Sequence, residues 1–396
     1  MHALDLMEKT RDNCPMTQRS FDFAVVGAGC FGAWTARALL DAGHSVILLD
    51  AYGAAHSRAS SGGESRVIRM GYGLDALYTR WSMRSLAVWR ELDARCQQRI
   101  FHPAGMLWMS GSEAGYVADT QRTLRDLGVA HERLSPQETA KRFPLIAVDD
   151  LSWALWEPNS GALMARRAIQ TLVAESVREG MAYRIANIAA PDSSGSIRSA
   201  DGETISAAKF VFACGPWLPK LFPSLLGQRI FPTRQEVFFF APPAGDLSCG
   251  SASMPAWLHH PDLVYGLPDL ENRGFKISID KHGPAFDPDT GSRLPSEDGL
   301  ATARAYLAKR FPTLRDATLT ESRVCQYENT SNGDFIIDRH PQRDDILIVG
   351  GGSGHGFKHG PAIGEYVCDL LTRSDFVAEP RFAMSSKATT QSRAVY

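Results

Sequence analysis

Apolar and polar residues alternate along the chain in segments of strand and helix length. The run Phe21–Val26 predicts a buried strand, Ala33–Asp41 has helical composition, and Val46–Leu49 predicts a second strand ending at Asp50. Gly43 ends the predicted helix. A strand, a helix and a second strand within about 30 residues predict a βαβ unit of a parallel sheet.

Two later segments also place glycine directly after a strand. Residues 211–213 precede Gly215, and residues 346–349 precede a glycine-rich stretch that leads into a helical run over 363–371. The nucleotide-binding part of the chain is therefore expected to form from three separated pieces. Residues 227–243, 262–270 and 273–280 have strand character instead and predict a second, mostly antiparallel sheet, whereas 286–299 is expected to be a polar surface loop.

The composition narrows the class of protein. The chain has 396 residues, 22% of them charged, and a net charge of -2, which gives no basic face for nucleic acid. No apolar run reaches the length of a membrane span, and the N-terminus has no secretory pattern. Seven cysteines without close pairs suit a reducing cytoplasm and predict neither a disulfide framework nor a metal site.

The turn after the first strand carries the clearest chemistry. Gly27, Gly29 and Gly32 form G-x-G-x-x-G around Cys30 and Phe31. Glycine at these positions allows a tight turn, close approach of the backbone to a pyrophosphate and close packing of the helix on the strand. The pyrophosphate is then expected at the helix N-terminus, with a ribose hydroxyl bound to the acidic residue that ends the second strand, Asp50. The motif predicts an adenine dinucleotide but does not by itself separate FAD from NAD.

Several longer stretches resemble the monomeric sarcosine oxidase and N-methyltryptophan oxidase family of FAD-dependent amine oxidases. They include VVGAGCFGAWTARALL, SSGGESRVIRMGYG, YGLPDLENRGFKIS, CQYENTSNGDFIIDRHP and GGGSGHGFKHGPAIGEYV, spread over residues 21–382. The resemblance implies a Rossmann-like FAD domain (α/β, within an α+β two-domain chain) and a substrate domain on a mostly antiparallel sheet. We expect the FAD domain to use 20–100, 155–226 and 320–390, the substrate domain 101–154 and 227–319, and 1–19 and 385–396 to be flexible tails.

The resemblance also implies roles for individual residues. Cys325 matches the cysteine that carries covalent FAD, and Arg66 and Lys358 match two cations that hold the substrate carboxylate. Lys276 matches the lysine that promotes reaction with oxygen, where a fixed positive charge stabilises developing negative charge. Tyr265 and Tyr327 match substrate-pocket positions. Further cofactor contacts are expected from Ser60, Ser65, Cys214, Gly215, Trp217, Gly352, Gly354, His355, Gly356, Phe357 and Lys358, and from Arg69, for which an ion pair with Glu64 is the alternative.

Three pocket positions depart from the family pattern. Gly62 and Asp280 stand where sarcosine oxidases have histidine, and Leu74 stands where they have an acidic residue. Gly62 and Leu74 are expected to leave more room, and Asp280 to favour a cation or hydrogen-bond donor on the substrate. We therefore expect oxidation of a C–N bond in a secondary or other amino acid larger than sarcosine, giving an imine and hydrogen peroxide.

The sequence leaves other functions open. One is a flavin dehydrogenase or tailoring enzyme of the same fold that uses another electron acceptor. Others are an NAD-dependent dehydrogenase and a flavin-binding protein with a degraded site, the latter suggested by the missing histidines. A monomer is expected from the family.

Overall fold

The computed structural model describes residues 20–191 and 197–391. Its first layer is a six-stranded sheet in the order β18-β19-β12-β1-β2-β9, parallel except for β18 at one edge. This order confirms the Rossmann-like prediction, because the three separated pieces supply adjacent strands. The strands are β1 (Phe21–Val26), β2 (Val46–Asp50), β9 (Ala182–Ile185), β12 (Ala207–Phe212), β18 (Ile336–His340) and β19 (Arg343–Gly350).

Helix α1 (Cys30–Asp41) begins three residues before the predicted start, because Gly29 is its N-cap. It packs on α9 (Gly360–Thr372), where glycine is required by the close approach. A Cβ on Gly364 would lie 2.4 Å from the carbonyl oxygen of Trp34, and one on Gly360 would lie 2.5 Å from Cys30 Sγ. Two helices far apart in sequence are thereby held with their N-terminal ends beside each other.

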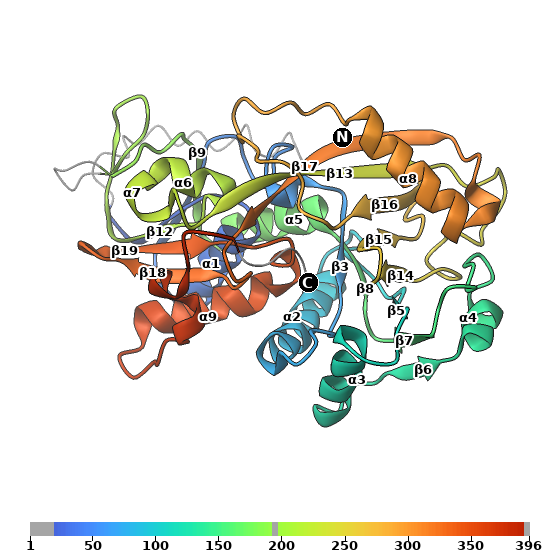
Figure 1. Ribbon diagram of the computed structural model, residues 1–396. Coiled ribbons are helices and arrows are strands. Elements are labelled where there is room, and N and C mark those ends of the chain that lie inside the picture. Colours follow the sequence, from blue (N-terminus) through green and yellow to red (C-terminus); the bar gives the residue numbers. More distant parts are fainter. Residues whose placement is uncertain (1–19, 192–196, 392–396) are drawn as a thin grey trace.

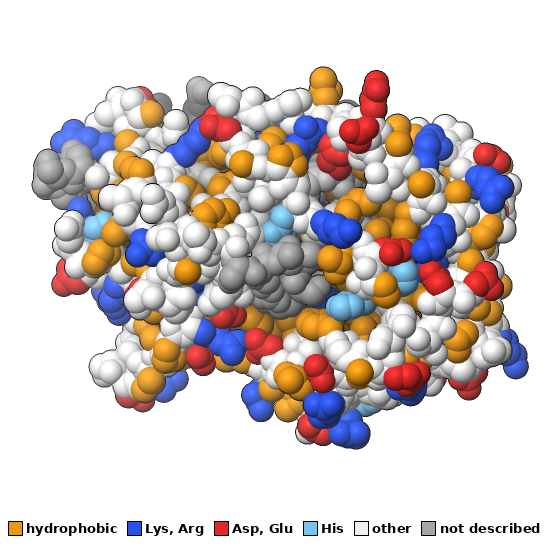
Figure 2. Space-filling model, in the orientation of Figure 1, with side chains coloured by type: hydrophobic (Ala, Val, Ile, Leu, Met, Phe, Trp, Pro, Cys, Tyr) orange, Lys and Arg blue, Asp and Glu red, His pale blue; other side chains and the backbone are white. Residues whose placement is uncertain are grey.

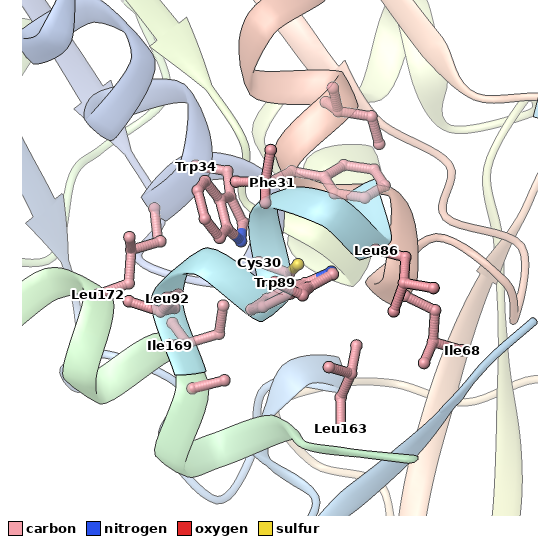
Figure 3. Packing of buried hydrophobic residues seen from close by; sticks show 14 of the residues in the cluster. Cys30, Phe31, Trp34, Ile68, Leu86, Trp89, Leu92, Leu163, Ile169 and Leu172 are labelled. Atoms are coloured by element: carbon pink, nitrogen blue, oxygen red, sulfur yellow. The ribbon is translucent and has the colours of Figure 1, made fainter. Parts of the chain in front are cut away.

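Helices α2 (Ala76–Arg95) and α5 (Ala165–Arg178) complete the apolar layer on this side of the sheet (Figure 3). Trp34 of α1 meets Trp89 of α2 edge to face, with ring centroids 5.0 Å apart. The Trp89 indole N–H donates to the Lys358 carbonyl at 2.9 Å, so its one polar atom is satisfied. This packing fixes the glycine-rich segment before α9 against the body of the molecule.

The second layer is an eight-stranded sheet in the order β17-β13-β16-β15-β14-β5-β7-β6, antiparallel except for the β14–β5 pair. Figure 1 shows its two long strands, β13 and β17, extending between the two halves of the molecule. This sheet confirms the predicted antiparallel layer. Its strands are β5 (Met106–Ser110), β6 (Glu132–Leu134), β7 (Trp153–Glu157), β13 (Phe231–Phe240), β14 (Ala256–His259), β15 (Val264–Leu267), β16 (Phe275–Ile279) and β17 (Leu319–Asn329).

The smaller elements connect these layers. A three-stranded sheet has the order β3-β8-β4, and its edge strand β3 is residues 65–68. It comprises β3 (Ser65–Ile68), β4 (Phe101–His102) and β8 (Gly161–Met164), and the remaining elements are β10 (Ile197–Arg198), β11 (Thr204–Ile205), α3 (Tyr116–Asp126), α4 (Pro136–Arg142), α6 (Leu218–Leu221), α7 (Pro223–Leu226) and α8 (Glu297–Arg310).

Some expected boundaries differ from the structure. The proposed domain limits at 155 and 320 fall inside β7 and β17, so each change of domain comes after those strands. The polar loop ends at Ser296, whose side chain caps α8. Residues 385–391 are not a free tail, because Lys387 is buried and the Ala388 amide donates to Ser331 Oγ at 2.9 Å. The expected tails 1–19 and 392–396 lie outside the described residues.

The surface agrees with the near-neutral charge of the chain. Among the described residues on the face in Figure 2, Lys and Arg side chains are interspersed with Asp and Glu, with no continuous band of either sign. Within 20–191 and 197–391, no helix is both long enough and apolar enough to cross a membrane.

Candidate active site

A cavity of about 330 Å³ opens at the carboxyl ends of the parallel strands and continues along β17. This is the edge of an open α/β sheet where ligands bind. Sixteen of the predicted site residues line it: Gly27, Gly29, Cys30, Phe31, Asp50, Ser60, Arg66, Cys214, Gly215, Trp217, Cys325, Tyr327, Gly352, Gly354, Gly356 and Phe357.

The glycine turn has the geometry that the motif predicts. Gly27 has a φ of +105°, and a Cβ there would lie 2.4 Å from the Ala213 carbonyl oxygen. A Cβ on Gly32 would lie 1.8 Å from the Gly27 carbonyl oxygen, so Gly32 sits behind the turn rather than in the cavity. The turn therefore brings the N-terminus of α1 against the cavity wall, where its amides can face a phosphate.

Asp50 lies at the first end of the cavity and is almost fully buried. Its carboxylate accepts from the Ala28 amide at 2.8 Å and from the amides of Tyr52 and Gly53 at 2.8 and 2.9 Å. Three amides fix its orientation and leave lone pairs for a ligand hydroxyl. Sequence reasoning missed Ser61, whose Oγ accepts from the Cys30 amide at 2.9 Å at the start of α1.

Cys325 lies at the other end of the cavity, on β17. The guanidinium of Arg66 donates to its Sγ at 3.3 Å and to the carbonyls of Ser60 and Ser65 at 2.6 and 2.9 Å. Glu64 pairs with Arg166, Arg273 and Arg323, and no ion pair joins it to Arg66 or to Arg69, for which it was the alternative partner.

Lys276 lies on β16, behind the wall that contains Cys325. Its Nζ donates to the Ser65 carbonyl at 2.8 Å, the same oxygen that accepts from Arg66. Burial and the neighbouring Arg66 charge hold the pKa of Lys276 well below its usual range. Lys276, Arg66 and Cys325 line a small cavity of about 20 Å³ together with Val237 and Phe239, and this volume is room for one water molecule.

Lys358 does not meet Arg66, contrary to the prediction. The Lys358 Nζ donates to the Tyr72 hydroxyl and to the His355 carbonyl, both at 2.8 Å. Arg69 lies over the same Tyr72 ring, 4.5 Å from its centroid, and Lys358 Nζ lies 5.3 Å from it. The structure thus places Lys358 with Arg69, which directly follows β3, whereas Arg66 lies near the start of that strand.

Arg69 is a buried cation without a carboxylate partner within salt-bridge distance among the described residues. It is held between the rings of Tyr72 and Trp108, and its Nη1 donates to the Gly71 carbonyl. Burial and the Arg69 charge hold the pKa of Lys358 well below its usual range. Two such cations in one buried place favour an anionic ligand.

Histidine rings complete the surroundings of Lys358. His359 Nε2 lies 2.7 Å and His355 Nδ1 lies 3.3 Å from the Tyr72 hydroxyl. The other His355 nitrogen lies 3.0 Å from the Gly333 carbonyl. His355 thus faces this network and does not line the cavity, so its part is to hold Tyr72 and Lys358 in place.

A carboxylate stands near the two cations. Asp280 follows β16 and accepts from the Tyr327 hydroxyl at 2.8 Å. Burial and the Asp280 charge raise the pKa of Tyr265, and the same two causes raise the pKa of Tyr327 well above its usual value. The predicted pocket residues Tyr265, Tyr327 and Asp280 therefore do lie together, and the Asp280 charge also acts on Lys358.

The other two positions that depart from the family pattern, Gly62 and Leu74, do not form part of the region around Arg69, Lys358 and Asp280. A Cβ on Gly62 would lie 2.0 Å from the His56 carbonyl oxygen, so Gly62 is a packing glycine and leaves no room for substrate. Its carbonyl accepts from Arg166 at 2.6 Å. Leu74 is 63% exposed and does not form a wall of the cavity. Ser65 is buried and contributes its carbonyl, as described above, rather than a contact inside the cavity.

Comparisons with known proteins agree with this geometry. A family model described as FAD dependent oxidoreductase matches residues 22–370. The chain belongs to the FAD-dependent oxidoreductase family. It is 31% identical over 362 residues to a monomeric sarcosine oxidase from Bacillus sp. (strain B-0618), covering 88% of this chain and 92% of that protein. This match confirms the resemblance to the sarcosine oxidase group.

Two further matches are more distant in sequence. An N-methyl-L-tryptophan oxidase from Yersinia pestis (strain Pestoides F) is 27% identical over 355 residues, covering 87% of this chain and 93% of that protein. The crystal structure of an L-proline dehydrogenase from P. horikoshii superposes with a TM-score of 0.81 at 18% identity, covering 92% of this chain and 97% of that one. The last similarity shows the shared fold.

The cavity fits the FAD of this family. Its glycine turn approaches a ligand closely, Asp50 and Glu328 are carboxylates at separate points along it, and one oxygen of Glu328, Oε2, is buried without a hydrogen-bond partner. Polar groups at separate points among apolar lining residues suit a long dinucleotide better than a compact ligand. The enzyme is therefore an FAD-dependent oxidoreductase, and the residues that line this cavity fit its cofactor.

Proposed function

We propose that this enzyme oxidises the C–N bond of an amino acid whose carboxylate binds Arg69 and Lys358. The observation that supports the proposal is the buried pair of cations around Tyr72, which has no carboxylate within salt-bridge distance among the described residues, although the charges of Asp280 and Glu157 act on both cations. A substrate carboxylate would supply the missing anion. The planar guanidinium of Arg69 suits a two-oxygen contact, and Lys358 adds a point charge.

Asp280 would orient the nitrogen of the substrate. Its carboxylate, held by Tyr327, favours a nitrogen that carries a hydrogen or a positive charge. The substrate is thus a primary or secondary amino acid, N-methylated or cyclic. The expectation that it is larger than sarcosine loses two of its three supports, since Gly62 and Leu74 do not enlarge the site.

FAD, when bound, supplies the chemistry by accepting two electrons from the C–N unit and passing them to oxygen, with an imine and hydrogen peroxide as products. Cys325 would hold the cofactor covalently, with Arg66 donating to its sulfur and fixing its position. Lys276 would present positive charge behind the Cys325 wall and favour the reaction with oxygen. The Gly360–Thr372 helix would direct its positive N-terminal end toward the pyrimidine end of the flavin ring.

The test is a panel of amines mixed anaerobically with the purified enzyme, with loss of the visible flavin absorbance as the readout. Amino acids should bleach it, and the matching amines without a carboxylate should not. Equal bleaching by both would contradict the Arg69–Lys358 assignment. Sarcosine as by far the best substrate would contradict the remaining expectation of a larger substrate.

A second candidate is a dehydrogenase that uses an acceptor other than oxygen. The fold similarity to an L-proline dehydrogenase makes it worth testing, and the position of Lys276 favours the oxidase. Peroxide production in air at a rate matching substrate loss would support the oxidase, and turnover only with an added dye would support the dehydrogenase.

We further propose a monomer in the cytoplasm. The six described cysteines, which are all but Cys14, form no disulfide with one another. This suits a reducing compartment.

A further inference from the structure

Glu328 is a buried carboxyl group that neither the glycine motif nor the proposed chemistry uses. It lies on β17, three residues beyond Cys325, and is 8% exposed. Its Oε1 accepts from the Gly352 amide at 3.2 Å, whereas its Oε2 is buried without a partner. In residues 20–191 and 197–391, no Lys, Arg or His lies within salt-bridge distance of it. Such a group needs a hydrogen-bond partner that the protein itself does not supply.

The surroundings of Glu328 locate it along the cavity. A Cβ on Gly215 would lie 3.3 Å from Glu328 Oε2, and Gly215 follows the segment that touches the Gly27 turn. Gly352, on the other side, lies against the Phe31 ring at the start of α1. Glu328 therefore lies beside the turn expected to hold the pyrophosphate, on the side toward Cys325.

The chemistry of the ligand portion follows from this position. A phosphate oxygen only accepts hydrogen bonds, so it could pair with the protonated carboxyl group but would be repelled by the ionised one, which makes it a poorer partner than a group that suits both forms. An apolar ring would leave Oε2 unpaired. A hydroxyl can donate to an ionised carboxyl group and accept from a protonated one. Asp50 already serves the ribose at the far end, so a second hydroxyl-bearing portion of the dinucleotide must lie near Glu328.

We propose that Glu328 binds the ribityl chain of FAD, by a hydrogen bond between its buried carboxyl group and a ribityl hydroxyl. Asp50 and Glu328 then mark the two polyol portions of the cofactor, on either side of the pyrophosphate. Burial raises the pKa of Glu328 to about 7, so the carboxyl group can donate or accept near neutral pH. The inference rests on FAD binding and not on the identity of the substrate.

The experiment measures FAD affinity by titrating apo-protein in a Cys325→Ala background, so that binding is reversible. Two ligands are compared: FAD, and an FAD analogue whose ribityl chain is replaced by a pentyl linker that carries no free hydroxyl group. Glu328→Leu should weaken FAD binding about 10- to 100-fold, the loss of a hydrogen bond to a charged group. The same substitution should leave the affinity for the analogue within about twofold, because the hydroxyl partner is already missing.

Controls separate this role from a structural one. Glu321→Leu removes a carboxylate at the other end of β17 and should change neither affinity, and the thermal midpoint of each apo-protein shows whether it folds. If the leucine variant does not fold, Glu328→Ala takes its place. Unchanged FAD affinity, or an equal loss for both ligands, would overturn the proposal. Normal FAD binding without reduction by any amino acid would instead overturn the proposed function alone.

Discussion

Replacing Lys358 with methionine should affect substrate binding and folding stability in opposite directions. Methionine keeps the apolar stem and removes the ammonium group. The Tyr72 hydroxyl keeps two histidine neighbours, at 2.7 and 3.3 Å. Because Lys358 is buried near Arg69 with only neutral hydrogen-bond partners, its charge costs folding free energy in the absence of substrate. The unfolding temperature of Lys358→Met should therefore be equal to or above that of the original enzyme.

The loss of substrate affinity can be sized from the same contacts. Removing one partner of a buried charge pair costs about 2–5 kcal/mol, which is about 30-fold to several thousand-fold in affinity. The assay is the KM of the best amino acid in the panel, together with calorimetric or fluorescence melting. Lys141→Met, on the exposed face of α4, is the matched control and should change neither. An unchanged KM, or a fall in melting temperature with the flavin still bound, would refute the reasoning.

Three further outcomes are expected. The affinity of a carboxylate inhibitor without an amine should fall as pH rises, because the bound anion raises the depressed pKa of Lys358. Between the pKa values of the free and the bound enzyme, binding therefore takes up a proton. Calorimetry in two buffers measures this proton uptake, which Lys358→Met should abolish. Denatured wild-type protein should keep its flavin, whereas Cys325→Ala should release it, and release from both would exclude the covalent link. Lys276→Met should slow oxygen consumption at least about tenfold, with little change in the anaerobic bleaching of the flavin by substrate. Arg69→Met should instead raise the KM for the amino acid. A raised KM in Lys276→Met together with slow oxygen consumption in Arg69→Met would contradict the assigned positions.

The part of the fold that could be predicted is local in sequence. The turn at Gly27–Gly32 and the acid at Asp50 belong to one short βαβ unit, so their types and spacing determine where they lie. The end of the predicted strand before Gly350 also matched, since buried parallel strands appear as continuous apolar runs.

The part that could not be predicted depends on contacts between distant segments. The resemblance implied that Lys358 binds the substrate together with Arg66, but in the structure Lys358 lies with Arg69 at the Tyr72 ring. The two arginines are three residues apart, and only the way β3 crosses the glycine-rich segment decides which of them lies near Lys358. Gly62 was interpreted as free space because no sequence pattern shows the His56 backbone against it. Glu328 was missed because a glutamate in a strand is ordinarily exposed.

Strand β17 also bears on how the enzyme matures. Its pairing with β13 joins segments about 90 residues apart, so it is a late contact during folding. This pairing sets Cys325 opposite Gln235, and a slip by one residue would turn the thiol to the other face of the sheet. If the flavin is attached at Cys325 as proposed, a chain that carries it covalently has passed through the correct pairing. The fraction of colour that survives denaturation would then record how much newly made protein reached its native register.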